Sequence, residues 1–479
     1  LNDYHIYTNI PEAAQTWVRF IEQFNLRPTW LFSLEGDSSQ TGEEPLILSE
    51  FGNWGLPALS EMTRDGEPEW FDLGPWWSSW DGTPGFPHEV QKRFEALGLK
   101  AIWSDYDSFA EATQWHQFAA LKFEIETMRR QPALAGYVIT ELTDIYWESN
   151  GLLDFYRRPK VYHDQFSQFN TPDVIVPQLT RWAYWDDEIT QVALHVSHYS
   201  PVDWGYAHLI TVFGEDQKSW PIPPTARGEV RALGDFFGRP SLAEKTELQF
   251  LKAELDDGKG QILAQSSTPI LVLPSASRRA AYMLPLNFVD SGTVDMASGL
   301  GDDLHELGYK VYSAEDARLC IADTVNADLL NWVAQGGDLL FLSEKQNPFI
   351  FQQGRGGAYS GNWMTSFSWL RPGVYERLKA VTSPVSLPFE GIMPSSVFVG
   401  LPVNDPAYQR DFLAGQITGW VGHPAPHTVQ FRYGHGRVIM TSYALKDHLL
   451  THPAATAMLH DLIDYLASDA CDPALTLKG

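Results

Sequence analysis

The sequence predicts a multidomain protein, because the pattern of apolar residues changes twice along the chain. Residues 1–165 alternate short apolar strands with amphipathic helices, which is typical of parallel α/β units. Residues 166–276 contain short runs of alternating apolar and polar residues, at 189–198, 206–213 and 246–255, which predict an antiparallel β-sandwich. Residues 277–479 return to helices alternating with strands, with one of the strands expected at 309–312, which favours a doubly wound α/β domain. A chain of 479 residues is too long for one ordinary core and is long enough for three domains.

The first part begins with a strand, a helix and a second strand. Residues 2–7 alternate in character and predict a short strand. A helix follows over residues 11–24, with proline and an acidic residue in its first turn and apolar residues at helical spacing. A polar loop then leads to the apolar run 46–48, which predicts a buried strand ending at Glu50. This order is that of a parallel βαβ unit.

Glu50 lies at the carboxyl end of that predicted strand, where parallel α/β barrels place their chemistry. Gly52 and Gly55 allow the backbone to bend or to approach a ligand. Asn53 and Trp54 add an amide and a flat apolar face, and a carboxylate, an amide and an indole together suit a sugar ring. A glutamate after a strand can also cap a helix or lie in a solvated loop, and the residues alone leave both interpretations open.

A second strand end carries a similar set of side chains. Ser108 with Glu111 three residues later predicts the N-cap of a helix that ends near residue 131. Residues 134–140 then predict another buried strand. Acids, an amide and an indole follow this strand: Glu141, Asp144, Trp147, Glu148 and Asn150. Two neighbouring strand ends of this kind indicate one shared pocket.

The segment 58–100 between these two strands is long and irregular. It holds four tryptophans among glycines and prolines: Trp70, Trp76, Trp77 and Trp80. So many aromatic residues argue against disorder. The segment either packs a small core of its own or forms a wall of sugar-stacking rings.

Charge and cysteine content exclude several classes of function. The net charge is -26, with a pI near 4.8, so nucleic acid and anionic membrane surfaces would be repelled. No run of about 18 apolar residues occurs, so no membrane span is expected. The two cysteines, Cys320 and Cys471, form neither a disulfide framework nor a metal-ligand cluster, and we expect no cofactor and no metal. The chain begins at Leu1 without a leader pattern, and we expect a processed chain or a piece of a longer one.

The segment 48–55, Leu-Ser-Glu-Phe-Gly-Asn-Trp-Gly, resembles the nucleophile region of glycoside hydrolase family 2, and the segment 136–159 resembles the last barrel strand and exit of that family. The order of domains is also similar to long bacterial members, including a last domain with the sequence Tyr-Gly-His-Gly-Arg-Val at 433–438. The resemblance implies strands 6 to 8 of a (β/α)8 TIM barrel in residues 1–165 and an immunoglobulin-like β-sandwich in 166–276. It implies a flavodoxin- or glutamine-amidotransferase-like, or trimerisation-type, α/β domain in 277–479.

By the same resemblance, the protein is a retaining exo-β-glycosidase with Glu50 as the nucleophile. A β-galactoside is the favoured substrate and a β-mannoside the next. The family's general acid follows an asparagine on an earlier barrel strand, which this sequence lacks. We therefore expect the N-terminal half of the enzyme on a separate chain or missing segment. We also expect a homo-oligomer, while the localisation stays open, with the cytoplasm favoured weakly. Glu141 and Glu148 are alternatives for the acid within this sequence.

The remaining candidate residues would bind the carbohydrate substrate. They are His5, Tyr7, Asn53, Trp54, Asp144, Trp147 and Asn150. The lack of an Asn-Glu pair upstream of Glu50, and of strands to close a barrel, also supports an alternative of another class. In that alternative the protein is a non-catalytic glycan-binding or assembly protein derived from a glycoside hydrolase.

Overall fold

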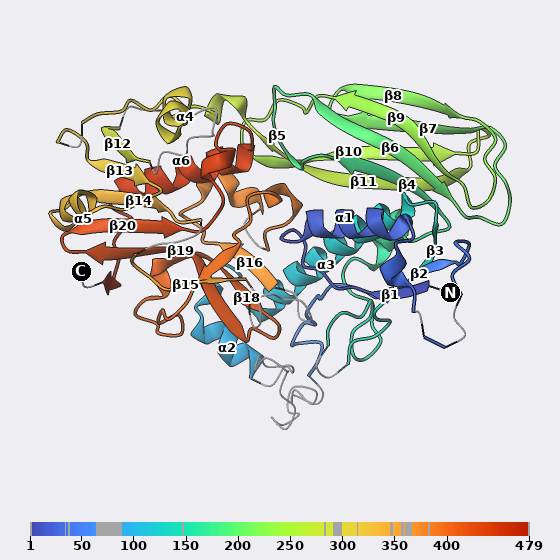
Figure 1. The fold of residues 1–479 in the computed structure, drawn as a ribbon, viewed down its shortest axis with the longest axis horizontal. Coiled ribbons are helices and arrows are strands. Elements are labelled where there is room, and N and C mark those ends of the chain that lie inside the picture. The colour runs from blue at the N-terminus through green and yellow to red at the C-terminus, as the bar shows by residue number, and fades with distance from the viewer. Residues whose placement is uncertain are drawn as a thin grey trace.

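The computed structural model consists of several β-sheets with a few helices packed against them (Figure 1). The described residues are 2–33, 35–36, 39–63, 89–145, 148–281, 284–290, 299–313, 315–344, 348–355, 359, 366–381 and 384–477. The segment with four tryptophans at residues 70–80 lies outside them. Within them the strands fall into successive groups along the chain, which agrees with the expected multidomain organisation. The boundaries at 165 and 276 stay predictions.

The first group is a parallel sheet of three described strands in the order β1-β2-β3. It comprises β1 (Asn2–His5), β2 (Leu46–Phe51) and β3 (Leu134–Ile139), and both pairings are parallel. Helices α1 (Ala14–Asn25) and α3 (Tyr106–Arg129) provide the crossovers. Strand direction and order follow the sequence prediction. Three strands do not close a barrel, so the TIM barrel stays a prediction.

The helices of this part form where their apolar residues share one face. On α1 the buried face holds Trp17, Ile21 and Phe24 at helical spacing. The prediction of Ser108 as N-cap of α3 is wrong: the Asp105 carboxylate accepts a hydrogen bond from the Ser108 backbone N–H at 2.7 Å. Aspartate three residues earlier fills the N-cap role because its carboxylate is a stronger acceptor than a hydroxyl. A short helix, α2 (Val90–Ala96), precedes α3.

The second group consists of two sheets in the orders β4-β6-β9 and β5-β11-β10-β7-β8. Alternation over residues 189–198, 206–213 and 246–255 correctly indicated three of these strands. Their pairing is antiparallel, except that β5 runs parallel to β11. An immunoglobulin-like topology stays a prediction. The strands are β4 (Asp173–Leu179), β5 (Ala183–Trp185), β6 (Thr190–His198), β7 (Ala207–Phe213), β8 (Asp216–Ile222), β9 (Val230–Gly238), β10 (Glu247–Asp256) and β11 (Ile262–Leu273).

The third group is a mixed sheet in the order β12-β13-β14-β20-β19-β18-β16, with β21 beside β19. Its first four strands are parallel, as expected for a doubly wound domain, and the pairs from β20 to β16 are antiparallel. The strand predicted at residues 309–312 is a single bridge from Val311 to Leu286. The strands are β12 (Leu286–Val289), β13 (Leu319–Ala322), β14 (Asp338–Leu342), β16 (Ser366–Leu370), β18 (Phe412–Thr418), β19 (His423–Tyr433), β20 (Gly436–Thr441) and β21 (Thr476–Leu477).

Further elements complete this third group. Strands β15 (Gln352–Gly354) and β17 (Ser396–Phe398) form a separate antiparallel pair. Helices α4 (Leu300–Glu306), α5 (Ala327–Ala334) and α6 (Pro453–Ala467) pack against the mixed sheet (Figure 1). None of the described helices is both long and apolar enough to cross a membrane.

Each hydrophobic core among the described residues is shared by two groups of elements. One cluster joins α1, α3 and the first sheet to the strands of the second group. Another joins Trp185 and Leu273 at the end of the second group to the third. A third joins Trp54 and Phe109 to Trp420 in the loop between β18 and β19. Helices α1 and α3 therefore lie between the first sheet and the second group (Figure 1).

Candidate functional site

Glu50 is the fifth residue of β2, and its backbone is aligned with His5 of β1. Its side chain is 42% exposed. Tyr7 donates a hydrogen bond from its hydroxyl to Glu50 Oε2 at 3.1 Å, and His5 Nδ1 lies 3.3 Å from the same oxygen. The carboxyl ends of parallel strands meet at one edge of the sheet, which is why residues 43 and 45 positions apart contact one carboxylate.

Tyr7 is held in the protonated state that this contact needs. Burial raises the pKa of its phenol, and the negative charges of Glu50 and Glu148 raise that pKa further, while a hydrogen bond with the Thr140 side chain opposes them. The hydroxyl therefore remains a hydrogen-bond donor throughout the neutral pH range. It holds one oxygen of Glu50 in place.

A fully buried carboxyl, Glu124 of α3, lies behind this edge of the sheet. Glu124 Oε1 accepts hydrogen bonds from Asn53 Nδ2 at 2.8 Å and Thr8 Oγ1 at 3.3 Å. Burial raises the pKa of Glu124 well above its usual value, and these two bonds oppose the shift. Glu124 was not among the predicted site residues. A glutamate between Leu121 and Ile125, inside an apolar helical stripe, is the sequence signal that could have identified it.

Two further carboxyl groups follow β3. Burial raises the pKa of Glu141 to about 7, the nearby charge of Glu148 raises it too, and Lys160 opposes them. Glu148 is 8% exposed, and Asn150 Nδ2 donates to its Oε2 at 3.4 Å. Since Glu148 acts on the pKa of both Tyr7 and Glu141, these groups lie within electrostatic range of one another. A carboxyl that holds its proton near neutral pH has the property required of a general acid.

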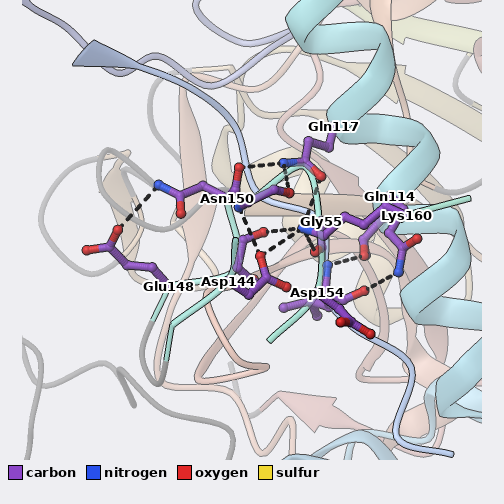
Figure 2. Close-up of polar contacts among 12 residues, drawn as sticks. Gly55, Gln114, Gln117, Asp144, Glu148, Asn150, Asp154 and Lys160 are labelled. Atoms are coloured by element: carbon purple, nitrogen blue, oxygen red, sulfur yellow. Dashed lines mark hydrogen bonds and ion pairs between the residues drawn. The ribbon is translucent and has the colours of Figure 1, made fainter. Parts of the chain in front are cut away.

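The loops after β2 and β3 are tied together by a buried lysine (Figure 2). Lys160 Nζ lies 3.1 Å from Asp144 Oδ1 and donates to the backbone carbonyls of Gly55 at 2.7 Å and Ser149 at 2.9 Å. Burial lowers the pKa of Lys160 and raises that of Asp144, and the contact between them opposes both shifts. The ammonium thus links the two loops that flank Glu50.

Gln117 of α3 reinforces the same link (Figure 2). Its Nε2 donates to the carbonyls of Asn53 at 2.8 Å and Asn150 at 2.9 Å, and its Oε1 accepts from Lys160 at 3.2 Å and Tyr162 at 3.0 Å. One buried amide therefore satisfies backbone groups from both loops. The helix that crosses between β2 and β3 fixes the position of the residues that follow each strand.

The predicted site residues fall into two sets. His5, Tyr7 and Glu50 meet at the edge of the sheet. Asn53, Trp54, Asp144 and Asn150 are all buried behind that edge, each at most 3% exposed. Trp54 packs against Trp420 with ring centroids 6.1 Å apart. Trp147 lies outside the described residues.

Three cavities of the described chain have linings that do not include Glu50. One of them, of about 830 Å³, is lined by other residues, several of which belong to α3. In the part of the chain that the structure describes, no three His, Cys, Asp or Glu side chains are arranged to hold a metal ion.

Comparison with known proteins does not assign a family. No protein-family model and no curated protein matches the sequence. The exo-chitosanase CsxA of Amycolatopsis orientalis is 14% identical with a TM-score of 0.33, over 55% of this chain and 30% of that chain. A variant of that enzyme with PNP-β-D-glucosamine is 12% identical with a TM-score of 0.32, over 81% and 44%. An exo-β-1,4-mannosidase from an Opitutaceae bacterium is 12% identical with a TM-score of 0.20, over 94% and 65%.

The similarity to these solved structures is partial in length and low in score. The chain spans less than half of the length of the exo-chitosanase structures. TM-scores of 0.20 to 0.33 do not establish a shared fold.

Proposed function

We propose that the protein is a retaining exo-β-glycosidase in which Glu50 is the nucleophile. The observation that carries the proposal is the placement of a half-exposed carboxylate at the carboxyl end of β2, with one oxygen held by Tyr7 and His5. Parallel α/β enzymes build their active sites at this edge of the sheet. The sequence around Glu50, which resembles the nucleophile region of glycoside hydrolase family 2, supports the same role.

In the proposed reaction, Glu50 attacks the anomeric carbon and forms a glycosyl ester as the glycosidic bond breaks. The electron pair of that bond passes to the leaving oxygen, which takes a proton from a general acid. Water then attacks the anomeric carbon, gives its proton to the same acid residue, and releases Glu50 as a carboxylate. Tyr7 keeps the carboxylate oriented during the first attack.

The general acid is proposed to lie on an N-terminal half of the enzyme, which would also supply the strands beside β1 and β3. Each of these strands pairs only with β2 among the described strands, so each leaves one edge of the sheet for a partner. Glu141, with its pKa of about 7, is the alternative acid within this chain. We also propose a β-galactoside as the favoured substrate, a β-mannoside as the next, and a homo-oligomeric assembly.

Replacement of Glu50 tests the proposal. In the protein assembled with its N-terminal half, Glu50→Gln should lower kcat for an aryl β-glycoside by about 10³-fold or more, because an amide cannot form the glycosyl ester. Glu111→Gln is the matched control, since Glu111 is exposed on α3, and it should keep normal turnover. Wild-type turnover in Glu50→Gln would contradict the role of Glu50.

A non-catalytic glycan-binding protein is the second candidate. It is favoured by the 42% exposure of the Glu50 side chain, which leaves the carboxylate accessible to solvent. In this case, both the normal protein and Glu50→Gln would bind a β-glycoside saturably, and neither would hydrolyse it.

A further inference from the structure

The cavity of about 830 Å³ lies where all three groups of elements meet. Its walls come from α1 and α3, from strands β4, β10 and β11, and from described residues between 380 and 388. It is separate from the edge of the sheet that holds Glu50. A volume of this size is typical of sites for small organic ligands, which commonly lie between domains.

The walls are mostly apolar and carry several aromatic rings. Trp115 and Phe118 contribute from α3, Trp182 from the segment between β4 and β5, and Phe250 from β10. Phe250 is 48% exposed and lines the cavity, so an apolar ring lies at its edge. Such walls favour an apolar body of a ligand over a hydrated sugar.

Of the charged side chains that line the cavity, Arg130 has no carboxylate close to it among the described residues. Lys122 forms an ion pair with Glu126 and donates to Ser266 Oγ at 3.1 Å, so these charges compensate each other. Arg130 also lines the cavity, and no carboxylate of the described chain lies within 4.0 Å of its guanidinium. Burial lowers the pKa of Arg130, while the charges of Glu22 and Glu126 oppose this shift. The net charge of the protein is -26, so the positive charge of Arg130 in this cavity is opposite in sign to that of the protein as a whole.

A neutral polar group in the same cavity also lacks a partner. Thr268 of β11 is 6% exposed, and its Oγ1 is buried without a hydrogen-bond partner. A buried hydroxyl without a partner costs free energy that a ligand acceptor or donor would recover. His116, the remaining titratable lining residue, is neutral because burial lowers its pKa.

We propose that this cavity binds an amphiphilic carboxylate, with its apolar body between the aromatic walls and its carboxylate beside Arg130. The guanidinium presents planar paired donors that match a carboxylate, and the low polarity of the surroundings strengthens the contact. Binding is non-covalent and does not depend on the proposed glycosidase activity.

Calorimetric titration with decanoate tests the site, with decanol as the uncharged ligand of the same length. Decanoate should bind saturably at one site per chain, and at least about tenfold more tightly than decanol. Arg130→Met should weaken decanoate binding by about tenfold or more and leave decanol binding unchanged. Arg239→Met is the matched control, because Arg239 is exposed in the second group away from the cavity, and it should bind both ligands normally.

A variant that fills the cavity locates the binding. Ala119 lines the wall on α3, and Ala119→Trp should abolish binding of both ligands. Thr268→Val provides a smaller change in case Ala119→Trp does not fold, as judged by thermal unfolding, and should weaken decanoate binding measurably. The absence of saturable decanoate binding would overturn the proposal, as would equal affinity for decanol or undiminished binding in Ala119→Trp and Thr268→Val. Activity toward glycosides is measured separately, so failure here leaves the role of Glu50 intact.

Discussion

At the scale of single residues, the contact between Tyr7 and Glu50 determines what the proposed site can do. The phenol donates to one carboxylate oxygen and leaves the other oxygen for attack on a sugar. His5 touches the same oxygen from the neighbouring strand and also contacts Ser49 Oγ at 3.0 Å. The site therefore depends on the parallel alignment of β1 and β2, which brings these three side chains together.

Tyr7→Phe should lower kcat of the assembled enzyme by about 10- to 100-fold, because a hydrogen bond to a charged group contributes roughly 1.5–3 kcal/mol. The free energy of unfolding should change by less than about 1 kcal/mol, because the ring and its packing are retained. Tyr156→Phe, at a partly exposed tyrosine in the loop after β3, is the control. Steady-state kinetics and urea unfolding measure both quantities, and unchanged kcat in Tyr7→Phe would show that the contact does not assist catalysis.

At the scale of elements, α3 is both the crossover between β2 and β3 and the support for the loops that follow them. Its apolar spacing was enough to predict a helix. Its functional contribution comes from Gln114, Gln117 and Glu124, polar residues that face inward. Gln114 Nε2 donates to the carbonyl of Leu56 at 2.9 Å, in addition to the bonds of Gln117. Polar residues on a buried helical face are an informative feature of a sequence, because each must find a partner.

Lys160→Met should destabilise the protein by about 3–5 kcal/mol at pH 8, because it leaves the carboxylate of Asp144 buried without its cation. The loss should be smaller at pH 5, since the pKa of Asp144 is raised by burial to about 7 and a protonated carboxyl needs no cation. Lys100→Met is the control at an exposed lysine that pairs with Glu95. A loss below about 1 kcal/mol at pH 8 in urea unfolding would contradict a structural role for this ion pair.

At the scale of the whole molecule, shared cores bind the three groups into one body. The ion pair between Arg355 and Glu12 at 2.9 Å adds a polar link between the loop after β1 and the third group. Within the third group, His460 of α6 has its Nδ1 2.6 Å from the Tyr309 hydroxyl and its Nε2 3.1 Å from the carbonyl of Arg278. We therefore expect cooperative unfolding of the described parts.

His460 should make stability depend on pH. Burial lowers its pKa to about 4, so the unfolded chain takes up a proton below pH 6.5 that the folded protein does not. Stability from this group is present above pH 6.5 and is lost as the pH falls towards 4. Between pH 7 and pH 4.5, the free energy of unfolding of His460→Gln should fall by roughly 2–3 kcal/mol less than that of the wild-type protein. His435→Gln, at an exposed histidine, should keep the normal pH dependence, and equal slopes in all three proteins would contradict the prediction.

The sequence predicted the parallel order of the first strands, and the structure agrees. The burial predicted for residues 134–140 is wrong in part, because β3 is buried at Leu134 whereas its Val138 is 53% exposed. The sequence also pointed to the meeting of His5, Tyr7 and Glu50. The antiparallel strands β16, β18 and β19 were missed, because strands buried on both faces lack alternation. The buried position of Trp54 depends on Trp420, 366 residues away, and no local pattern reports such a contact.

Covalent labelling with a 2-fluoro β-glycoside tests the role of Glu50 most directly. The fluorine slows hydrolysis of the glycosyl ester, so the ester should accumulate on the assembled enzyme. Intact mass should show one sugar added per chain, and peptide mapping should place it on Glu50. A label on another residue, or turnover of an aryl β-glycoside without any label on Glu50, would contradict the account.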